Sequence, residues 1–194
     1  MALDTTQQNR RMTHFNDHES IWLFGYGSLI WKAGFDYLER RPAHIRGWTR
    51  RFWQGSHDHR GTPTAPGRVA TLLPASGAIC HGMAYRITPD ILGPLDVREK
   101  NGYLREVVTL RFADGDTAQG LVYIATEDNA AYLGEAPAEA IARQIAAARG
   151  PSGPNRDYLL NLDEALRALD VKDAHVAELA HHVRHLDSEA PDAR

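Results

Sequence analysis

One glutamate, Glu99, stands where a carboxylate can carry a proton. It ends a short segment that starts near Pro89, and Asn101 and Gly102 then supply helix stop signals. At a helix C-terminus the helix dipole disfavours the ionised carboxylate, and partial burial acts in the same direction. Both effects favour the protonated acid, which suits a general acid/base near neutral pH. The alternative, which the pattern alone favours, is a solvated Arg-Glu-Lys cluster on a helix surface.

A second candidate site follows the apolar run at residues 21–24. Two glycines permit backbone conformations with positive φ there and leave amide N–H groups uncovered. Such a loop can bind a carboxylate or a developing oxyanion without a charged side chain. Taken alone, the pattern favours an ordinary turn after a strand. The residues of this loop are Gly25, Tyr26, Gly27, Ser28, Leu29 and Ile30.

The densest group of charged and aromatic side chains spans residues 50–61, which hold three arginines, two histidines and two aromatic residues. Arginine forks can bind a substrate carboxylate through two hydrogen bonds. His57 and His59 would need a third ligand to hold a metal ion, and no matching motif follows, so we expect no metal site. A structural, hydrogen-bonded loop is the main alternative to substrate binding.

The elements that must position these residues fall into two groups. Short apolar runs bounded by turn residues predict six strands, at residues 21–24, 45–53, 69–73, 79–86, 104–112 and 119–126. Apolar residues three and four apart predict helices over 137–150, 159–169 and 176–186, with a short or kinked helix after Pro89. Strands and helices do not alternate regularly, which argues against a doubly wound parallel sheet. We predict an α+β fold with a mixed sheet curled toward a barrel.

Length and composition limit the class of protein. A chain of 194 residues with 43% apolar residues fits one domain with one core. We expect a flexible N-terminal segment over residues 1–19, a single domain over 20–186 and a flexible tail over 187–194. The net charge of −3 matches a nucleic-acid binder poorly. With one cysteine, no signal sequence and no membrane-length apolar stretch, the chain is expected in the cytoplasm.

Taken in order along the chain, these segments resemble the ChaC-type glutathione-specific γ-glutamylcyclotransferases. The similarity runs from about residue 21 to residue 169, most of the chain. Many ordered blocks are far more specific than one short motif. The strongest blocks are residues 24–32, 50–56 and 58–63, and the similarity continues through 66–69, 98–103 and 150–155.

The resemblance implies a γ-glutamylcyclotransferase-like fold, a small mixed β-barrel or curled sheet with surrounding helices. It places the catalytic acid/base at Glu99 and makes residues 25–30 the cradle for a γ-glutamyl group. It implies no metal and no organic cofactor. The expected partner is the small molecule glutathione, and neither a nucleic acid nor a membrane is expected to bind. The protein is expected to be a monomer or a homodimer. Further substrate contacts are expected from Arg60, Arg68, Arg98 and Tyr103, and one of these arginines is expected to pair with the glycyl carboxylate.

The implied reaction is an internal cyclisation. The α-amine of the γ-glutamyl group attacks its own γ-carbonyl, which forms 5-oxoproline and releases Cys-Gly. Because the nucleophile belongs to the substrate, no catalytic serine or cysteine is needed, and Glu99 would move the proton from the amine to the departing nitrogen. Two alternatives are a cyclase for γ-glutamyl amino acids or amines, and a non-catalytic regulator of cation transport.

Overall fold

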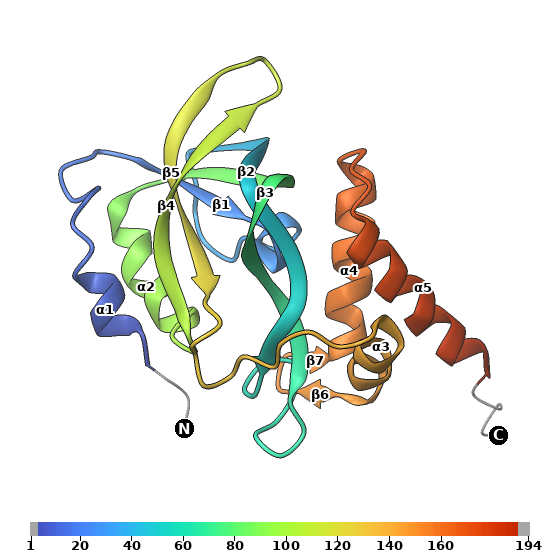
Figure 1. Ribbon diagram of the computed structural model, residues 1–194. Helices are drawn as coiled ribbons and strands as arrows, with labels where there is room; N and C mark the ends of the chain where they lie inside the picture. The colour runs from blue at the N-terminus through green and yellow to red at the C-terminus, as the bar shows by residue number, and fades with distance from the viewer. Residues whose placement is uncertain (1–3, 190–194) are drawn as a thin grey trace. The chain divides into compact units, whose positions relative to one another are not determined.

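The apolar runs form a closed five-stranded barrel in the order β1-β3-β2-β4-β5, shown in the computed structural model of Figure 1. β1 pairs antiparallel with β3 and parallel with β5, so the sheet is mixed. The predicted α+β fold with a curled, mixed sheet is therefore confirmed. The strands are β1 (Ile21–Gly25), β2 (Glu39–Ser56), β3 (Gly67–Ile87), β4 (Tyr103–Phe112) and β5 (Thr117–Ala125).

The structure describes residues 4–189, and these cluster into two compact units that are interleaved in sequence. The first unit contains residues up to 50 together with 71–132, and the second contains 51–70 and the residues from 133 onward. The sequence predicts one domain over 20–186. The division arises because β2 and β3 are long enough to supply residues to both units.

β3 departs from the sequence prediction. The run Pro74-Ala75-Ser76-Gly77 suggests a turn between two strands, yet β3 continues through it as one strand of 21 residues. Pro74 and Gly77 are both exposed, and Gly77 takes a positive φ of 76°. Within sheets, proline is tolerated at edges and bulges, where the ladder does not require its missing N–H. Turn residues therefore mark an irregular stretch of β3 and not its end.

The first unit also carries α1 (Thr6–Arg10), η1 (Ser28–Ile30), η2 (Pro89–Ile91) and α2 (Leu92–Arg98). The interrupted helix expected after Pro89 is present as η2 followed by α2. The sequence predicts a flexible segment over residues 1–19, whereas Thr6–Arg10 are helical and Thr5, Asn9 and Phe15 are buried. Residues 1–3 lie outside the described part of the chain. α1 contacts both α2 and β4, as Figure 1 shows.

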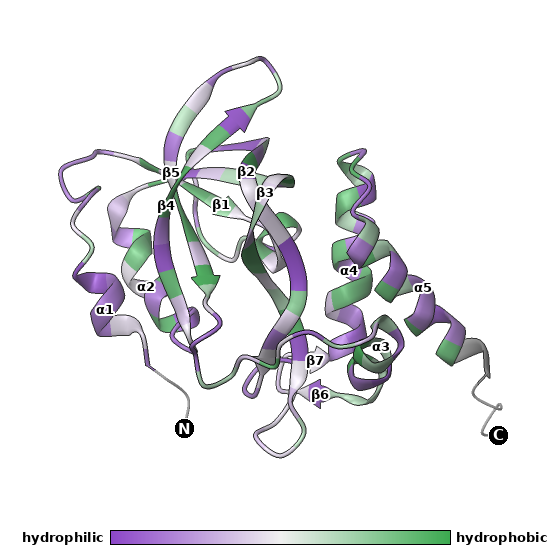
Figure 2. Cartoon of the chain, in the orientation of Figure 1, coloured by the Kyte–Doolittle hydropathy of each residue, from purple (hydrophilic) through white to green (hydrophobic). Residues whose placement is uncertain are grey.

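The second unit contains three helices, α3 (Ala138–Ala147), α4 (Asn155–Ala168) and α5 (Ala174–Glu189), with the short strands β6 (Arg149–Gly150) and β7 (Gly153–Pro154). All three helices contact one another through the apolar residues that the spacing identified. Figure 2 shows hydrophobic and hydrophilic bands alternating along α5, as one buried face requires. The tail expected over 187–194 begins within α5, and residues 190–194 lie outside the described chain. No helix among residues 4–189 is long and apolar enough to cross a membrane.

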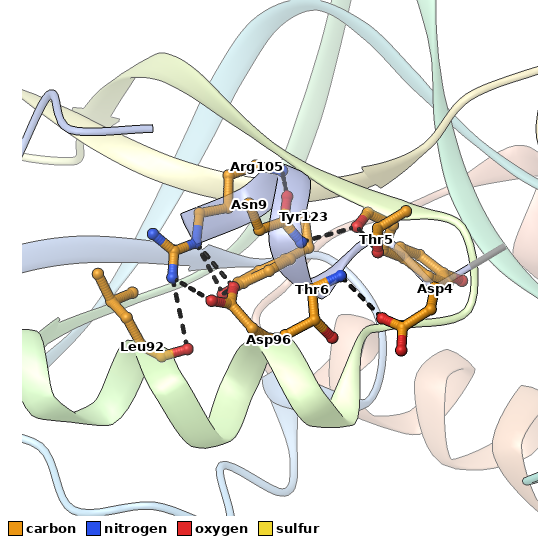
Figure 3. A network of polar contacts seen from close by, with 9 residues as sticks. Asp4, Thr5, Thr6, Asn9, Leu92, Asp96, Arg105 and Tyr123 are labelled. Atoms are coloured by element: carbon orange, nitrogen blue, oxygen red, sulfur yellow. Dashed lines mark hydrogen bonds and ion pairs between the residues drawn. The ribbon is translucent and has the colours of Figure 1, made fainter. Parts of the chain in front are cut away.

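A buried ion pair fixes α2 to the barrel (Figure 3). Asp96 in α2 is fully buried, and its two carboxylate oxygens accept hydrogen bonds from Arg105 Nε at 2.8 Å and Nη2 at 2.6 Å. The hydroxyl of Tyr123 on β5 donates to the same carboxylate at 2.8 Å. Desolvation by burial raises the pKa of Tyr123 well above its usual value, so this hydroxyl keeps its proton and remains a donor. α2 is thereby joined to β4 and β5 at one carboxylate.

Removing this carboxylate should destabilise the fold strongly. The variant Asp96→Ala leaves the Arg105 guanidinium buried without its anion, and such a loss costs about 3–5 kcal/mol. The control is Asp114→Ala, which removes the partner of Arg41 at an exposed site where ion pairs contribute little. Urea denaturation followed by circular dichroism measures both. Equal losses in the two variants would contradict a special role for Asp96.

Candidate active site

The loop at residues 25–30 is shaped by close packing and not by positive φ. Neither glycine has a positive φ, and Gly27 lies at φ −123°. Gly25 is required for space, because a Cβ there would lie 2.4 Å from Leu29 Cβ. Gly82 on β3 serves the same end, since a Cβ on it would lie 2.2 Å from the Gly25 carbonyl oxygen. The predicted loop is present, but for a different physical reason from the one inferred from its glycines.

Buried side chains bind the carbonyl groups of this loop. Arg50, 2% exposed, donates from Nε to the Tyr26 carbonyl at 2.8 Å and from Nη2 to the His81 carbonyl at 2.5 Å. The Tyr85 hydroxyl donates to the Leu29 carbonyl at 2.5 Å. The Tyr26 hydroxyl donates to the Tyr123 carbonyl at 2.7 Å. The loop is therefore fixed by hydrogen bonds to its Tyr26 and Leu29 carbonyls and by the bond that the Tyr26 hydroxyl donates.

Two amide groups of the same loop have no hydrogen-bond acceptor among the described residues. Gly27, Ser28 and Leu29 are all partly exposed, while Tyr26 and Ile30 on either side are buried. Within residues 4–189, no group accepts a hydrogen bond from the N–H of Ser28 or Leu29. Fixed carbonyls and open amides give the loop a surface that can donate hydrogen bonds to an anion.

Glu99 follows the last residue of α2. Its own N–H donates to the Leu95 carbonyl at 2.8 Å, and its side chain is 21% exposed. The Arg98 Nε lies 3.4 Å from Glu99 Oε1. This cation stabilises the negatively charged form of the carboxylate, the form that can accept a proton. The side chain is thus partly buried, and it lies beside a guanidinium that opposes the effects of burial and the helix dipole.

Arg98 joins the loop to Glu99. Its Nη2 donates to Ser28 Oγ at 3.1 Å, and its Nη1 donates to the Ala33 carbonyl at 3.0 Å. Together with the contact to Glu99, these bonds place three predicted site residues in one cluster of the first unit. Tyr103 begins β4 four positions after Glu99, and its carbonyl accepts hydrogen bonds from Thr5 and Asn9.

The two other predicted arginines lie in the second unit and bind groups of that unit. Arg68 is 7% exposed and donates to the Phe52 carbonyl, the Gly134 carbonyl and Gln144 Oε1. Arg60 donates to the Pro154 carbonyl at 3.0 Å. Arg60 and Arg68 therefore both stabilise the second unit through hydrogen bonds within it.

The histidine-rich segment makes ordinary loop contacts. His59 Nδ1 lies 3.2 Å from Ser152 Oγ, and its Nε2 lies 3.6 Å from Asp58. Among residues 4–189, no three histidine, cysteine, aspartate or glutamate side chains are grouped so that they could hold a metal ion.

Sequence reasoning missed the buried polar residues beneath the site, chiefly Arg50, Tyr85, Asp96 and Tyr123. The burial of Arg50 could have been predicted. Alternate residues of a strand point to the same face, and Arg50 alternates with Phe52 and Gln54, which are buried. For Asp96 the only signal was its position within the short helix before Glu99. A buried charge is invisible in sequence until its partner is known.

A closed, mixed barrel with surrounding helices is the fold of the γ-glutamyl cyclotransferases. The structure is similar to a crystal structure of the yeast γ-glutamyl cyclotransferase specific to glutathione, with a TM-score of 0.82 and 32% identity. The similarity covers 87% of this chain and 97% of the yeast chain.

Sequence comparisons narrow the class to a family. The model of the family described as ChaC-like protein matches residues 21–186. The chain is 50% identical to γ-glutamylcyclotransferase 2-3 of Arabidopsis thaliana, over 89% of its own length and 93% of the relative's. It is 42% identical to the human glutathione-specific γ-glutamylcyclotransferase 1, over 84% of this chain and 78% of the human one. The chain belongs to the ChaC-like protein family.

The packing at Gly25 leads to a test of the loop. Gly25→Ala places a methyl group against Leu29, and overpacking of this kind costs about 1–3 kcal/mol. The matched control is Gly93→Ala in α2, where an added Cβ meets nothing within 4 Å. In guanidinium denaturation, the free energy of unfolding should fall clearly for Gly25→Ala and stay unchanged for Gly93→Ala. If Gly25→Ala unfolds at the same denaturant concentration as the parent, the loop is not constrained as described.

Proposed function

We propose that this chain breaks down glutathione by cyclising its γ-glutamyl group, releasing 5-oxoproline and Cys-Gly. The observation that carries the proposal is the cluster in which Arg98 contacts both Ser28 of the open loop and Glu99. An anion-binding surface and a proton-accepting carboxylate are the two parts that the reaction requires. Relatives that cover most of this chain bear the names of enzymes of this class.

The chemistry needs geometry more than a reactive side chain. The α-amine of the γ-glutamyl group forms a bond to the γ-carbonyl carbon, and the bond from that carbon to the cysteinyl nitrogen breaks. The attacking ammonium group loses two protons in becoming the lactam N–H, and the departing nitrogen gains two in becoming an ammonium group, so no water is consumed. Holding the substrate folded back replaces a rare conformation by a near-attack one, which can lower the barrier by several kcal/mol. Nucleophile and leaving group both belong to the substrate, and the proposed reaction therefore uses neither metal nor organic cofactor.

In this proposal Glu99 is the proton carrier. The amine is mostly protonated near neutral pH and must lose a proton before it attacks. The Glu99 carboxylate, which lies beside Arg98, accepts this proton and then returns one to the departing nitrogen. The open amides of Ser28 and Leu29 are proposed to bind either the substrate α-carboxylate or the developing oxyanion.

Among the three candidate arginines, Arg98 is the best supported partner for the glycyl carboxylate. It lies in the same unit as the loop and Glu99, and its side chain is 33% exposed. A guanidinium has five N–H donors, and the contacts described engage three of them. Two donors are left for a carboxylate of the substrate.

The remaining parts of the proposal concern the cellular location, the partners and the oligomeric state of the protein. The proposed location is the cytoplasm, which suits a chain whose single cysteine, Cys80, is a buried free thiol. Glutathione is the proposed small-molecule partner, with no role for nucleic acid or membrane, and the protein is proposed to act as a monomer or homodimer.

Replacing Glu99 tests the mechanism. Glu99→Gln keeps the shape of the side chain but cannot shuttle a proton, so formation of 5-oxoproline from glutathione should fall by about 10²- to 10⁴-fold. The matched control is Glu106→Gln on β4, an exposed glutamate that should leave the rate unchanged. Chromatographic detection of 5-oxoproline and Cys-Gly follows both products. A Glu99→Gln variant that works at the parent rate would rule out this role.

The choice of substrate separates the proposal from the related cyclases. Glutathione should be turned over faster than γ-glutamyl amino acids or γ-glutamylamines. A preference for the latter would reassign the substrate class, and glutathione binding without turnover by the parent would indicate a regulator.

Arg98 should determine the preference for a free glycyl carboxylate. Loss of a charge-assisted hydrogen bond is equivalent to about 10- to 100-fold in affinity. We therefore expect the parent to prefer glutathione over its C-terminal amide in kcat/KM, and Arg98→Ala to turn over both at nearly equal, reduced rates. Arg60→Ala serves as the control and should retain the preference. If Arg60→Ala loses it instead, the carboxylate partner is Arg60.

A further inference from the structure

The N-terminal clamp, which we define as residues 4–9, lies against the turn that follows Glu99. The Thr5 N–H donates to the Lys100 carbonyl at 3.0 Å, and Asp4 forms an isolated antiparallel bridge with Asn101. The Thr5 hydroxyl lies 3.0 Å from the Lys100 carbonyl and 2.8 Å from the Tyr103 carbonyl. Thr5 is 1% exposed, so its hydroxyl has no competing water. The clamp therefore binds both carbonyl groups that bracket the turn.

The side chain of Asn9 binds the β4 backbone with one donor and one acceptor, as a neighbouring strand would. Its Nδ2 donates to the Tyr103 carbonyl at 3.0 Å, and its Oδ1 accepts from the Arg105 N–H at 2.9 Å. These two backbone groups point to the same edge of β4, where a neighbouring strand would pair with them. β4 pairs with β2 at Arg111 and Phe112, at the other end of the strand. One buried amide side chain thus occupies the place of a strand at the start of β4.

The clamp and the buried ion pair hold Glu99 from its two sides. Before Glu99, Asp96 is bound by Arg105 and Tyr123. After Glu99, the carbonyls of Lys100 and Tyr103 are bound by the clamp. Figure 3 shows Thr5 and Asn9 next to Arg105, in the same polar network as Asp96 and Tyr123. The backbone around Glu99 is held over residues 96–103 by hydrogen bonds at both ends, buried at Asp96 and partly buried at Tyr103.

We propose that Thr5 and Asn9 are positioning residues for Glu99. The proposal rests on the function proposed above for Glu99 and adds an element to it. The family model matches residues 21–186, so the clamp lies outside the matched region. A displacement of about 1 Å at a catalytic group can reduce a rate by about 100-fold, which makes such support consequential. Neither Thr5 nor Asn9 touches the substrate in this account.

The test removes the hydrogen bonds while keeping the side-chain volume. In Thr5→Val and Asn9→Leu, we expect kcat for glutathione to fall by about 10- to 100-fold while KM stays within about twofold. Thr5→Ser keeps the hydroxyl and should restore the parent kcat. The control is Gln8→Ala, an exposed residue of the same short helix, which should change neither constant. Assays are run at a temperature where circular dichroism shows each variant to be folded.

Amide hydrogen exchange provides a readout that does not depend on activity. Both substitutions should speed exchange at Gly102 and Arg105 and leave the amides of β1 protected, as local release of the turn requires. If Asn9→Leu does not fold, Thr5→Val and Thr5→Ser alone decide the question.

Each result separates this proposal from the proposed function. Unchanged kcat in both variants, or a rise in KM at constant kcat, overturns the positioning role but leaves the role of Glu99 standing. A parent protein that forms no 5-oxoproline overturns the proposed function, and the positioning role falls with it. A fall in kcat that Thr5→Ser does not restore means that the clamp contributes only stability.

Discussion

The first unit depends on one fully buried carboxylate. Asp96 has no access to solvent, and an isolated ion is costly there, so α2 must lie where Arg105 and Tyr123 can both reach it. That requirement fixes the helix to β4 and β5 and leaves little freedom to the residues that follow it. Glu99 comes three positions later, at the helix end. The location of a partly exposed functional side chain is thus set by the desolvation of a different, hidden one.

The glycine loop is organised on the same principle with different groups. Buried donors from Arg50 and Tyr85 bind the carbonyls at the two ends of the loop. The Gly27 and Ser28 carbonyls, which share peptide groups with the amides of Ser28 and Leu29, accept hydrogen bonds from the backbone of residues 30–32. An unpaired buried donor or acceptor is expensive, so each such bond resists reorientation of its peptide. The loop can therefore present donors to an anion without reorganising, which is the condition for effective electrostatic stabilisation.

Much of the fold was predictable from periodicity. Strand and helix positions follow from apolar spacing, because burying one face is the dominant requirement on each element. What failed were local inferences from single residue types. Pro74 and Gly77 do not end β3, since exposed strand positions tolerate them, and Gly25 is needed for space and not for positive φ. The sequence predicts a flexible N-terminus because composition does not reveal that Thr5 and Asn9 bind backbone groups of β4. The loop and Glu99 are predicted from the sequence, but the buried side chains of Arg50, Tyr85 and Arg105 have partners 9 to 56 positions away, and no local pattern indicates pairing at that range.

The distribution of polar groups suits a reaction whose nucleophile is supplied by the substrate. An enzyme that activates its own serine or cysteine needs a base aligned with that residue, whereas a cyclisation needs a folded substrate and one proton carrier. The buried polar side chains accordingly support the loop and α2. The proposed substrate contacts come from backbone amides of the loop, the Arg98 guanidinium and the Glu99 carboxylate. Arg98 joins the loop to the carboxylate, because it donates a hydrogen bond to Ser28 and contacts Glu99. A displacement of α2 would therefore move both Glu99, the proposed proton carrier, and the loop. The rate and the binding of substrate should respond together to changes in this helix, and separately to changes in Gly25 or Glu99 alone.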